Sequence, residues 1–203
     1  MDLNLLVSTF LLVFVAELPD KTALATLMLA TRFPVRQVVV GAWLALLIQT
    51  AVAVVAGSLL QLLPEQPVRL AAGVGFLVFA VLVWRRNPEE EAKEEAKVEE
   101  EALESDRGSR SAPWLASFLV VFAAEWGDLT QLATAGLVAH TGKPLEVGVA
   151  AVAALWTVTL LAATLGSQLA RWMNPTLLNR AAAVLFAAIG VFMVASALDL
   201  HVG

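Results

Sequence analysis

The sequences Glu-Leu-Pro-Asp-Lys-Thr, at residues 17–22, and Glu-Trp-Gly-Asp-Leu-Thr, at residues 125–130, are two versions of one acidic motif. Each lies inside a long apolar stretch of this 203-residue chain. A charged residue at the centre of a membrane costs about 2.5 to 3.5 kcal/mol on insertion scales, and residues retained there usually have a function. The two motifs therefore predict a functional site at membrane depth.

The composition is that of an integral membrane protein. Hydrophobic residues make up 59% of the chain, whereas soluble domains average roughly 45 to 50%. Six apolar stretches match the length of about 20 residues that a transmembrane helix needs. They cover residues 3–29, 38–63, 68–84, 114–139, 145–170 and 176–198. We predict an all-α membrane protein with six transmembrane helices, of which the first and fourth are broken at the acidic motifs. No basic residue precedes the first stretch, which we expect to be a retained span and not a signal peptide.

The second half of the chain repeats the first at an offset of about 110 residues. Residues 14–17 match 122–125, and residues 57–58 match 166–167. Each half has three predicted spans, an odd number, so the halves would enter the membrane from opposite sides. Such inverted repeats are related by a pseudo-two-fold axis that brings matching mid-helix motifs together near the bilayer centre. We therefore predict a first repeat over residues 1–86, a second over residues 112–203, and one shared site.

The distribution of lysine and arginine indicates the orientation. Excluding residues 87–111, the segments on the side of the termini hold two basic residues and the other side holds six. The excess of positive charge marks the cytoplasmic side, so both termini are expected outside. Residues 87–111 form an acidic cytoplasmic linker, which we interpret as a solvated connection, with a cation-attracting antechamber as the alternative.

The acidic residues of the motifs are three positions apart in each half, which predicts that each pair projects from one helix face. Together they would form a cage of four carboxylates, and cages of oxygen suit the hard cations Mg²⁺, Ca²⁺ and Mn²⁺. The chain has no cysteine and only two histidines, both near predicted span ends, which argues against zinc or copper. The predicted cation ligands are Glu17, Asp20, Glu125 and Asp128, with neutral oxygens from Thr22, Thr130 and Gln131.

The predicted cage suggests exchange of a cation for protons. Lys21 lies one turn beyond Glu17 and can balance one charge, whereas Leu129 holds its place in the second motif. Desolvation and mutual repulsion favour protonated carboxyl groups in an empty site. Cation entry would then release protons, which is a mechanism for antiport across the lipid bilayer. No basic stripe indicates a nucleic-acid partner.

Two further features have alternative interpretations. Pro19 removes a backbone donor and Gly127 loosens the matching point, which indicates either a simple packing kink or a broken helix that exposes carbonyls to a cation. Gln49 and Thr159 occupy roughly matching places in the second and fifth spans. We favour hydrogen bonds between helices for both over cation binding.

The two motifs resemble the Glu-x-Gly-Asp-Lys/Arg-Ser/Thr motif of the GDT-type cation/proton antiporters, the family of the Golgi transmembrane-protein-165-like proteins and bacterial manganese exporters. That family carries one copy in the first and one in the fourth of six spans, and the resemblance covers nearly the whole chain. It implies a secondary transporter without a cofactor that exchanges Mn²⁺ or Ca²⁺ for protons and, in a bacterial member, exports the cation through the plasma membrane.

The resemblance also implies roles for individual residues. Pro19 stands where the family motif has glycine, and Leu129 stands where it has a basic residue, which leaves Lys21 as the only basic residue of the two motifs. The cation-binding acids it implies are Glu17, Asp20, Glu125 and Asp128, with Thr22 and Thr130 at the hydroxyl positions.

Two other classes of function use buried carboxylates. An intramembrane enzyme of the aspartyl hydrolase type needs two, one as general acid and one as general base. A passive channel lined by acidic groups conducts cations without proton coupling. Four carboxylates with internal symmetry favour a transporter that alternates access around a site at the membrane midplane.

Overall fold

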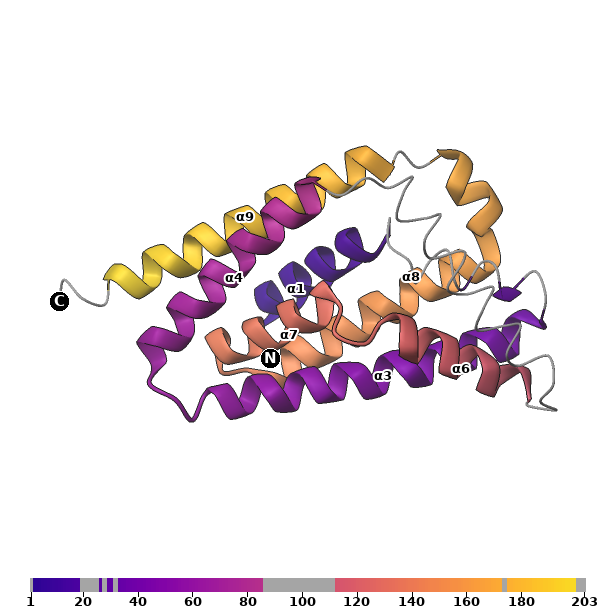
Figure 1. Cartoon of the computed structure of the whole chain (residues 1–203), viewed down its shortest axis with the longest axis horizontal. Helices are drawn as coiled ribbons and strands as arrows, with labels where there is room; N and C mark the ends of the chain where they lie inside the picture. The colour runs from indigo at the N-terminus through magenta and orange to yellow at the C-terminus, as the bar shows by residue number, and fades with distance from the viewer. Residues whose placement is uncertain are drawn as a thin grey trace.

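A computed structural model describes residues 2–18, 26, 29–30, 33–85, 112–172 and 175–199. Within these ranges the chain forms seven α-helices and no strand (Figure 1), which confirms the predicted all-α class. The helices are α1 (Leu3–Glu17), α3 (Val35–Leu60), α4 (Glu65–Arg85), α6 (Pro113–Ala124), α7 (Leu129–Thr141), α8 (Pro144–Trp172) and α9 (Pro175–Asp199).

Four of the helices are long and apolar enough to cross a membrane. These stretches are Val35–Leu60, Gln66–Arg85, Pro144–Leu165 and Thr176–Leu198. The 26 residues of α3 reach about 39 Å at about 1.5 Å per residue, which exceeds the hydrocarbon core of about 30 Å. These four stretches coincide with the second, third, fifth and sixth predicted spans to within a few residues over the part of the chain that the structure describes.

The fourth predicted span, residues 114–139, is two shorter helices. Helix α6 ends at Ala124 and α7 begins at Leu129, so the chain leaves the helical conformation at the second acidic motif. In the first motif, α1 ends at Glu17. The continuation of the first predicted span lies outside the described residues, apart from Thr26, Leu29 and Ala30.

The helices pack around α3 and the pair formed by α4 and α9. Helix α3 contacts α6, α7 and α8, while α1 lies against α8 and α4 lies along α9 (Figure 1). The approach of α3 to α6 is close at Gly41, where a Cβ atom would collide with the backbone of Trp114 and Phe118. Small residues permit such approach in membranes, where helices associate by packing and hydrogen bonding.

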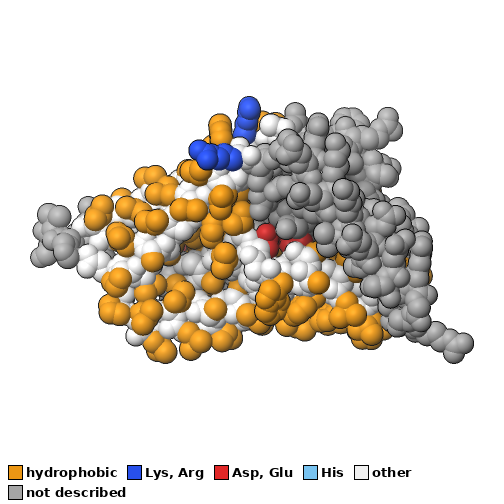
Figure 2. Space-filling model, viewed as in Figure 1, with side chains coloured by type: hydrophobic (Ala, Val, Ile, Leu, Met, Phe, Trp, Pro, Cys, Tyr) orange, Lys and Arg blue, Asp and Glu red, His pale blue; other side chains and the backbone are white. Residues whose placement is uncertain are grey.

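The face of the molecule shown in Figure 2 carries many hydrophobic side chains over its described part. Val52 of α3, Val78 of α4 and Val191 of α9 are 44%, 49% and 60% exposed. Contiguous apolar surface of this kind is rare on soluble monomers and is suited to contact with lipid. The described helices therefore support an integral membrane protein.

Candidate cation-binding site

Three carboxylates from both acidic motifs meet inside the protein. Glu17 is the last residue of α1, whereas Glu125 and Asp128 flank the break between α6 and α7. One carboxylate oxygen of each lies within 4.8 Å of the others, and the three residues are only 1%, 3% and 8% exposed. Residues more than 100 positions apart in sequence thus form one buried acidic cluster.

The break that positions Glu125 and Asp128 is a tight turn. Gly127 has a φ of +79°, a left-handed conformation that glycine adopts without the steric cost other residues incur. Asp128 then caps α7, because its Oδ2 accepts hydrogen bonds from the Thr130 nitrogen at 3.2 Å and the Thr130 hydroxyl at 2.8 Å. The expectation that Glu125 and Asp128 share a helix face is therefore wrong. Glu125 ends α6 and Asp128 precedes α7, and the turn between them brings their carboxylates close together.

Two glutamine side chains hold this turn against α3. The Gln49 side-chain nitrogen donates a hydrogen bond to the Phe122 carbonyl at 2.8 Å, which an unbroken helix would pair with its own backbone. Gln131 accepts from the Gly127 nitrogen at 2.9 Å and donates to the Gln49 carbonyl at 3.2 Å. The broken helix is thus fixed by side chains at a depth where unpaired backbone groups are costly.

The carboxylates line a small cavity of about 20 Å³. A cavity of at least about 10 to 15 Å³ holds one water molecule, so this space suits a single small occupant. Helices α1, α3, α7 and α8 and the turn before α7 all contribute to its wall. The lining residues are Glu17, Leu46, Gln49, Thr50, Glu125, Asp128, Thr130, Gln131, Thr134 and Leu155.

Three carboxylates line this cavity, so negative charge is concentrated there. Two unit charges 4.8 Å apart repel by about 3 to 4 kcal/mol at an effective dielectric constant of about 20. The described residues that line the cavity include no lysine or arginine. A cation bound between the three carboxylates would offset this repulsion.

Five predicted site residues line this cavity. They are Glu17, Glu125, Asp128, Thr130 and Gln131, whereas Asp20, Lys21 and Thr22 lie outside the described residues. The predicted hydrogen bond of Gln49 between helices is confirmed. That of Thr159 is wrong, because its hydroxyl donates to the Leu155 carbonyl of the same helix at 2.8 Å, a common alternative for threonine.

Sequence reasoning did not identify Thr50 and Thr134 as lining residues. Each donates its hydroxyl hydrogen bond to the backbone of its own helix, Thr50 to Leu46 and Thr134 to Thr130. A signal for Thr134 was present, since it lies one turn beyond Thr130. Thr50 carried the weaker signal of a polar residue next to Gln49 in an apolar span.

A buried carboxylate cluster beside a broken membrane helix is the arrangement found at the ion sites of secondary transporters. The fold and site thus define a membrane transport protein for cations.

Comparison with known sequences identifies the family. The sequence model of the divalent cation/proton antiporter GDT1 matches residues 5–91 and 113–201. The chain belongs to the GDT1 family of divalent cation/proton antiporters. Because this is a family of transporters and not of enzymes, the interpretation as an intramembrane hydrolase is not supported.

Several relatives are similar over most of the chain. GDT1-like protein 3 of Oryza sativa subsp. indica is 30% identical over 86% of this chain and 68% of its own length. A GDT1-like protein of Synechocystis sp. is 37% identical over 64% of this chain and 67% of its own. The chloroplastic PAM71-homolog of Arabidopsis thaliana is 32% identical over 88% of this chain and 56% of its own length. No solved structure gives a significant match.

Proposed function

We propose that this protein exports Mn²⁺, with Ca²⁺ as a second possible substrate, in exchange for protons. The observation that carries the proposal is the buried cluster of Glu17, Glu125 and Asp128, which offers three carboxylate oxygens within 4.8 Å of one another. Oxygen ligands of this kind suit Mn²⁺ and Ca²⁺. In this proposal Asp20 completes the ligand set, with neutral oxygens from Thr22, Thr130 and Gln131.

Proton coupling follows from the charge of the site. The three described carboxylates carry a charge of −3 when ionised, and a divalent cation reduces it to −1. In the absence of the cation, burial and mutual repulsion favour uptake of protons. Binding of the cation then displaces those protons, while Lys21 balances part of the remaining charge. Transport by alternating access would carry the cation in one direction and the protons in the other.

We further propose that residues 1–86 and 112–203 form two inverted repeats joined by an acidic linker at 87–111. The family model matches one segment in each half, and the site draws carboxylates from both. The packing of α3 on α6 and of α1 on α8 is the pattern that a two-fold relation between the halves would produce. The basic residues favour termini outside and a cytoplasmic linker. A bacterial plasma membrane as the location is part of the same proposal.

Proton release on cation binding tests the proposed coupling. Purified protein in weakly buffered detergent solution is titrated with Mn²⁺ and then Ca²⁺ while a pH indicator is followed. We expect acidification that saturates with Mn²⁺, and a much smaller response in Glu125→Gln. Glu146→Gln is the matched control, because Glu146 lies in the first turn of α8 outside the cavity. Saturating cation binding without proton release would contradict the coupling.

A further inference from the structure

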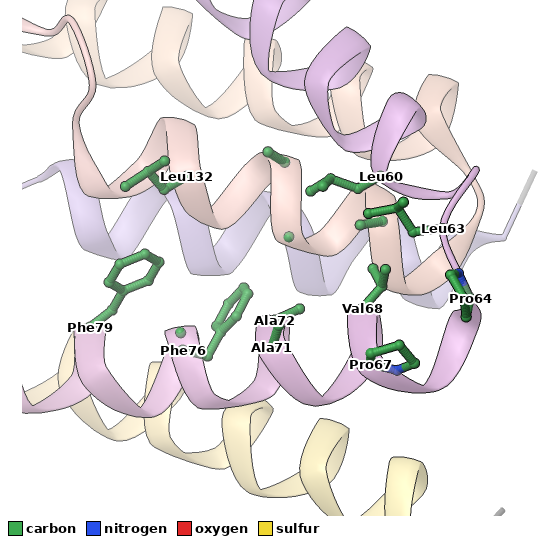
Figure 3. A pocket seen from close by; sticks show the side chains of 14 residues that line it. Leu60, Leu63, Pro64, Pro67, Val68, Ala71, Ala72, Phe76, Phe79 and Leu132 are labelled. Atoms are coloured by element: carbon green, nitrogen blue, oxygen red, sulfur yellow. The ribbon is translucent and has the colours of Figure 1, made fainter.

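A second, larger cavity lies on the other side of α7 from the carboxylate cluster. It has a volume of about 470 Å³ and is bounded by the end of α3, by α4 and by α7. Figure 3 shows Phe76 and Phe79 of α4 pointing toward α7, where Leu132 lies opposite them. We call this space the apolar groove. Its volume greatly exceeds the roughly 10 to 15 Å³ that one water needs.

Different residues of α7 line the apolar groove and the carboxylate cavity. Leu132, Gly136 and Ala139 line the apolar groove, whereas Thr130 and Thr134 line the carboxylate cavity. Residues three or four positions apart share a helix face, so these two sets point in different directions. Helix α7 therefore separates the apolar groove from the candidate cation site.

One end of the groove opens into a polar pocket. This pocket, of about 240 Å³, shares Leu63, Val68 and Ala139 with the groove and is also lined by Arg69 and His140. It lies where α3 ends, α4 begins and α7 ends, and such helix ends are expected at the membrane surface. Arg69, in the second turn of α4, contributes a positive charge to the wall of this pocket.

The polar pocket has the chemistry of an anion site. Burial lowers the pKa of His140, and the nearby charge of Arg69 lowers it further, which favours the neutral imidazole. The Nδ1 atom of His140 is buried and has no hydrogen-bond partner among the described residues. The pocket thus combines the positive charge of Arg69 with an imidazole nitrogen that can pair with a bound group.

We propose that the apolar groove and the polar pocket together bind one phospholipid of the surrounding bilayer. One acyl chain occupies the groove along Phe76 and Phe79, and the phosphate lies beside Arg69 and His140. The properties of α4 favour a lipid as the occupant. Its stretch Gln66–Arg85 has the length and hydropathy of a membrane span, and its Val74 and Val78 side chains are exposed, so this helix is suited to contact with the bilayer. A phospholipid has the same order of parts as the site, an anionic group followed by hydrocarbon.

Gly75 provides a direct test, because it lines the groove and a Cβ atom added there meets nothing within 4 Å. Gly75→Leu should fill the groove without a collision at the Cβ position. Val74→Leu is the control, since Val74 is exposed on the same helix but does not line the groove. Both variants are checked for monodispersity and helical content before use.

The protein is reconstituted in phosphatidylglycerol nanodiscs that contain phosphatidylglycerol with a photoactivatable acyl chain. After illumination, labelled residues are mapped by mass spectrometry. We expect labels concentrated at the groove-lining residues of α4 and α7, at least fivefold lower in Gly75→Leu and unchanged in Val74→Leu. Arg69→Gln should lower labelling by phosphatidylglycerol but not by a photoactivatable diacylglycerol, which has no phosphate.

Three results would overturn the proposal. Labels spread evenly over the exposed residues of α4 and unaffected by Gly75→Leu would mean that the groove holds no bound chain. Cross-links between two copies of the protein at the groove, in place of lipid labels, would mean that a second copy covers it. If Arg69→Gln lowered labelling by phosphatidylglycerol and by diacylglycerol equally, Arg69 would not be recognising a phosphate.

Discussion

Trp43 of α3 and Trp156 of α8 form a reciprocal pair. Their rings stack with centroids 4.6 Å apart and an interplanar angle of 13°. Each indole nitrogen donates a hydrogen bond to the backbone carbonyl of the other residue, at 3.1 and 3.2 Å. The contact is nearly symmetric, and it joins one long helix from each half of the chain. It therefore lies where a two-fold relation between the halves would have its axis.

The tryptophan pair should contribute to stability as a unit. We expect Trp43→Ala and Trp156→Ala to be non-additive by about 0.5 to 1.5 kcal/mol, the range measured for aromatic pairs beyond the area they bury. The measurement is a double-mutant cycle on the free energy of unfolding in mixed micelles. Strictly additive effects would mean that the two rings do not stabilise each other.

Gln49 should matter more than its polarity alone suggests, because it holds the end of α6 through the Phe122 carbonyl. Hydrogen bonds between membrane helices contribute about 0.6 kcal/mol on average and up to about 1.7, and Gln49→Leu should lower the free energy of unfolding by that amount. It should also weaken Mn²⁺ binding, measured by calorimetry. Thr159→Val serves as control, since Thr159 bonds only within its own helix. Equal effects of the two variants would argue against this role of Gln49.

Comparing substitutions at Gly127 and Gly142 distinguishes an effect on protein stability from an effect on the cation site. Both have a positive φ, +79° and +68°, and a Cβ atom at either meets nothing within 4 Å. Alanine at each should therefore cost about 1 to 2 kcal/mol through backbone conformation alone. Only Gly127→Ala should also reduce Mn²⁺ affinity, because Gly127 forms the turn between Glu125 and Asp128. A similar loss of affinity in Gly142→Ala would show that stability and not the turn decides binding.

Asp2 and Lys143 form an ion pair of 2.9 Å that links the start of α1 to the segment before α8. The hydrogen bond and charge of Lys143 lower the pKa of Asp2. A lowered pKa stabilises the fold above the unfolded value of about 3.9 and the effect is lost as the pH falls through the folded value. The unfolding temperature of the native protein should thus exceed that of Lys143→Gln at pH 6, and the difference should shrink below pH 4 and in high salt. A difference independent of pH would exclude the ion pair as its cause.

Four of the six spans could be predicted from the sequence because long apolar runs have few other structures available to them. The local geometry of the second acidic motif could not be predicted in this way. The spacing of Glu125 and Asp128 suits one helix face, yet the positive φ of Gly127 replaces the helix by a turn. Glycine is compatible with either conformation, and the turn is fixed by the Asp128 cap of α7 and by the contacts of Gln49 and Gln131 with the surrounding backbone.

The composition of the site shows the same limit of local reasoning. Glu17, Glu125 and Asp128 were predictable because a carboxylate in an apolar span is costly wherever it points. Thr50 and Thr134 were not, since a threonine can satisfy its hydroxyl within its own helix and so faces a cavity or lipid with little difference in cost. Their place in the cavity depends on how α3 and α7 are rotated in the packed protein.

The central claim is that the buried carboxylate cluster exchanges a divalent cation for protons. The most direct measurement is Mn²⁺ flux into proteoliposomes under an imposed pH gradient, with Glu17→Gln and Asp128→Asn as test variants and Glu146→Gln as control. We predict flux that requires the gradient, that alkalinises the lumen as Mn²⁺ enters, and that falls at least about tenfold in both test variants, equivalent to about 1.4 kcal/mol. Flux of Mn²⁺ and Ca²⁺ that is absent, that ignores the pH gradient, or that persists in both variants would contradict the account.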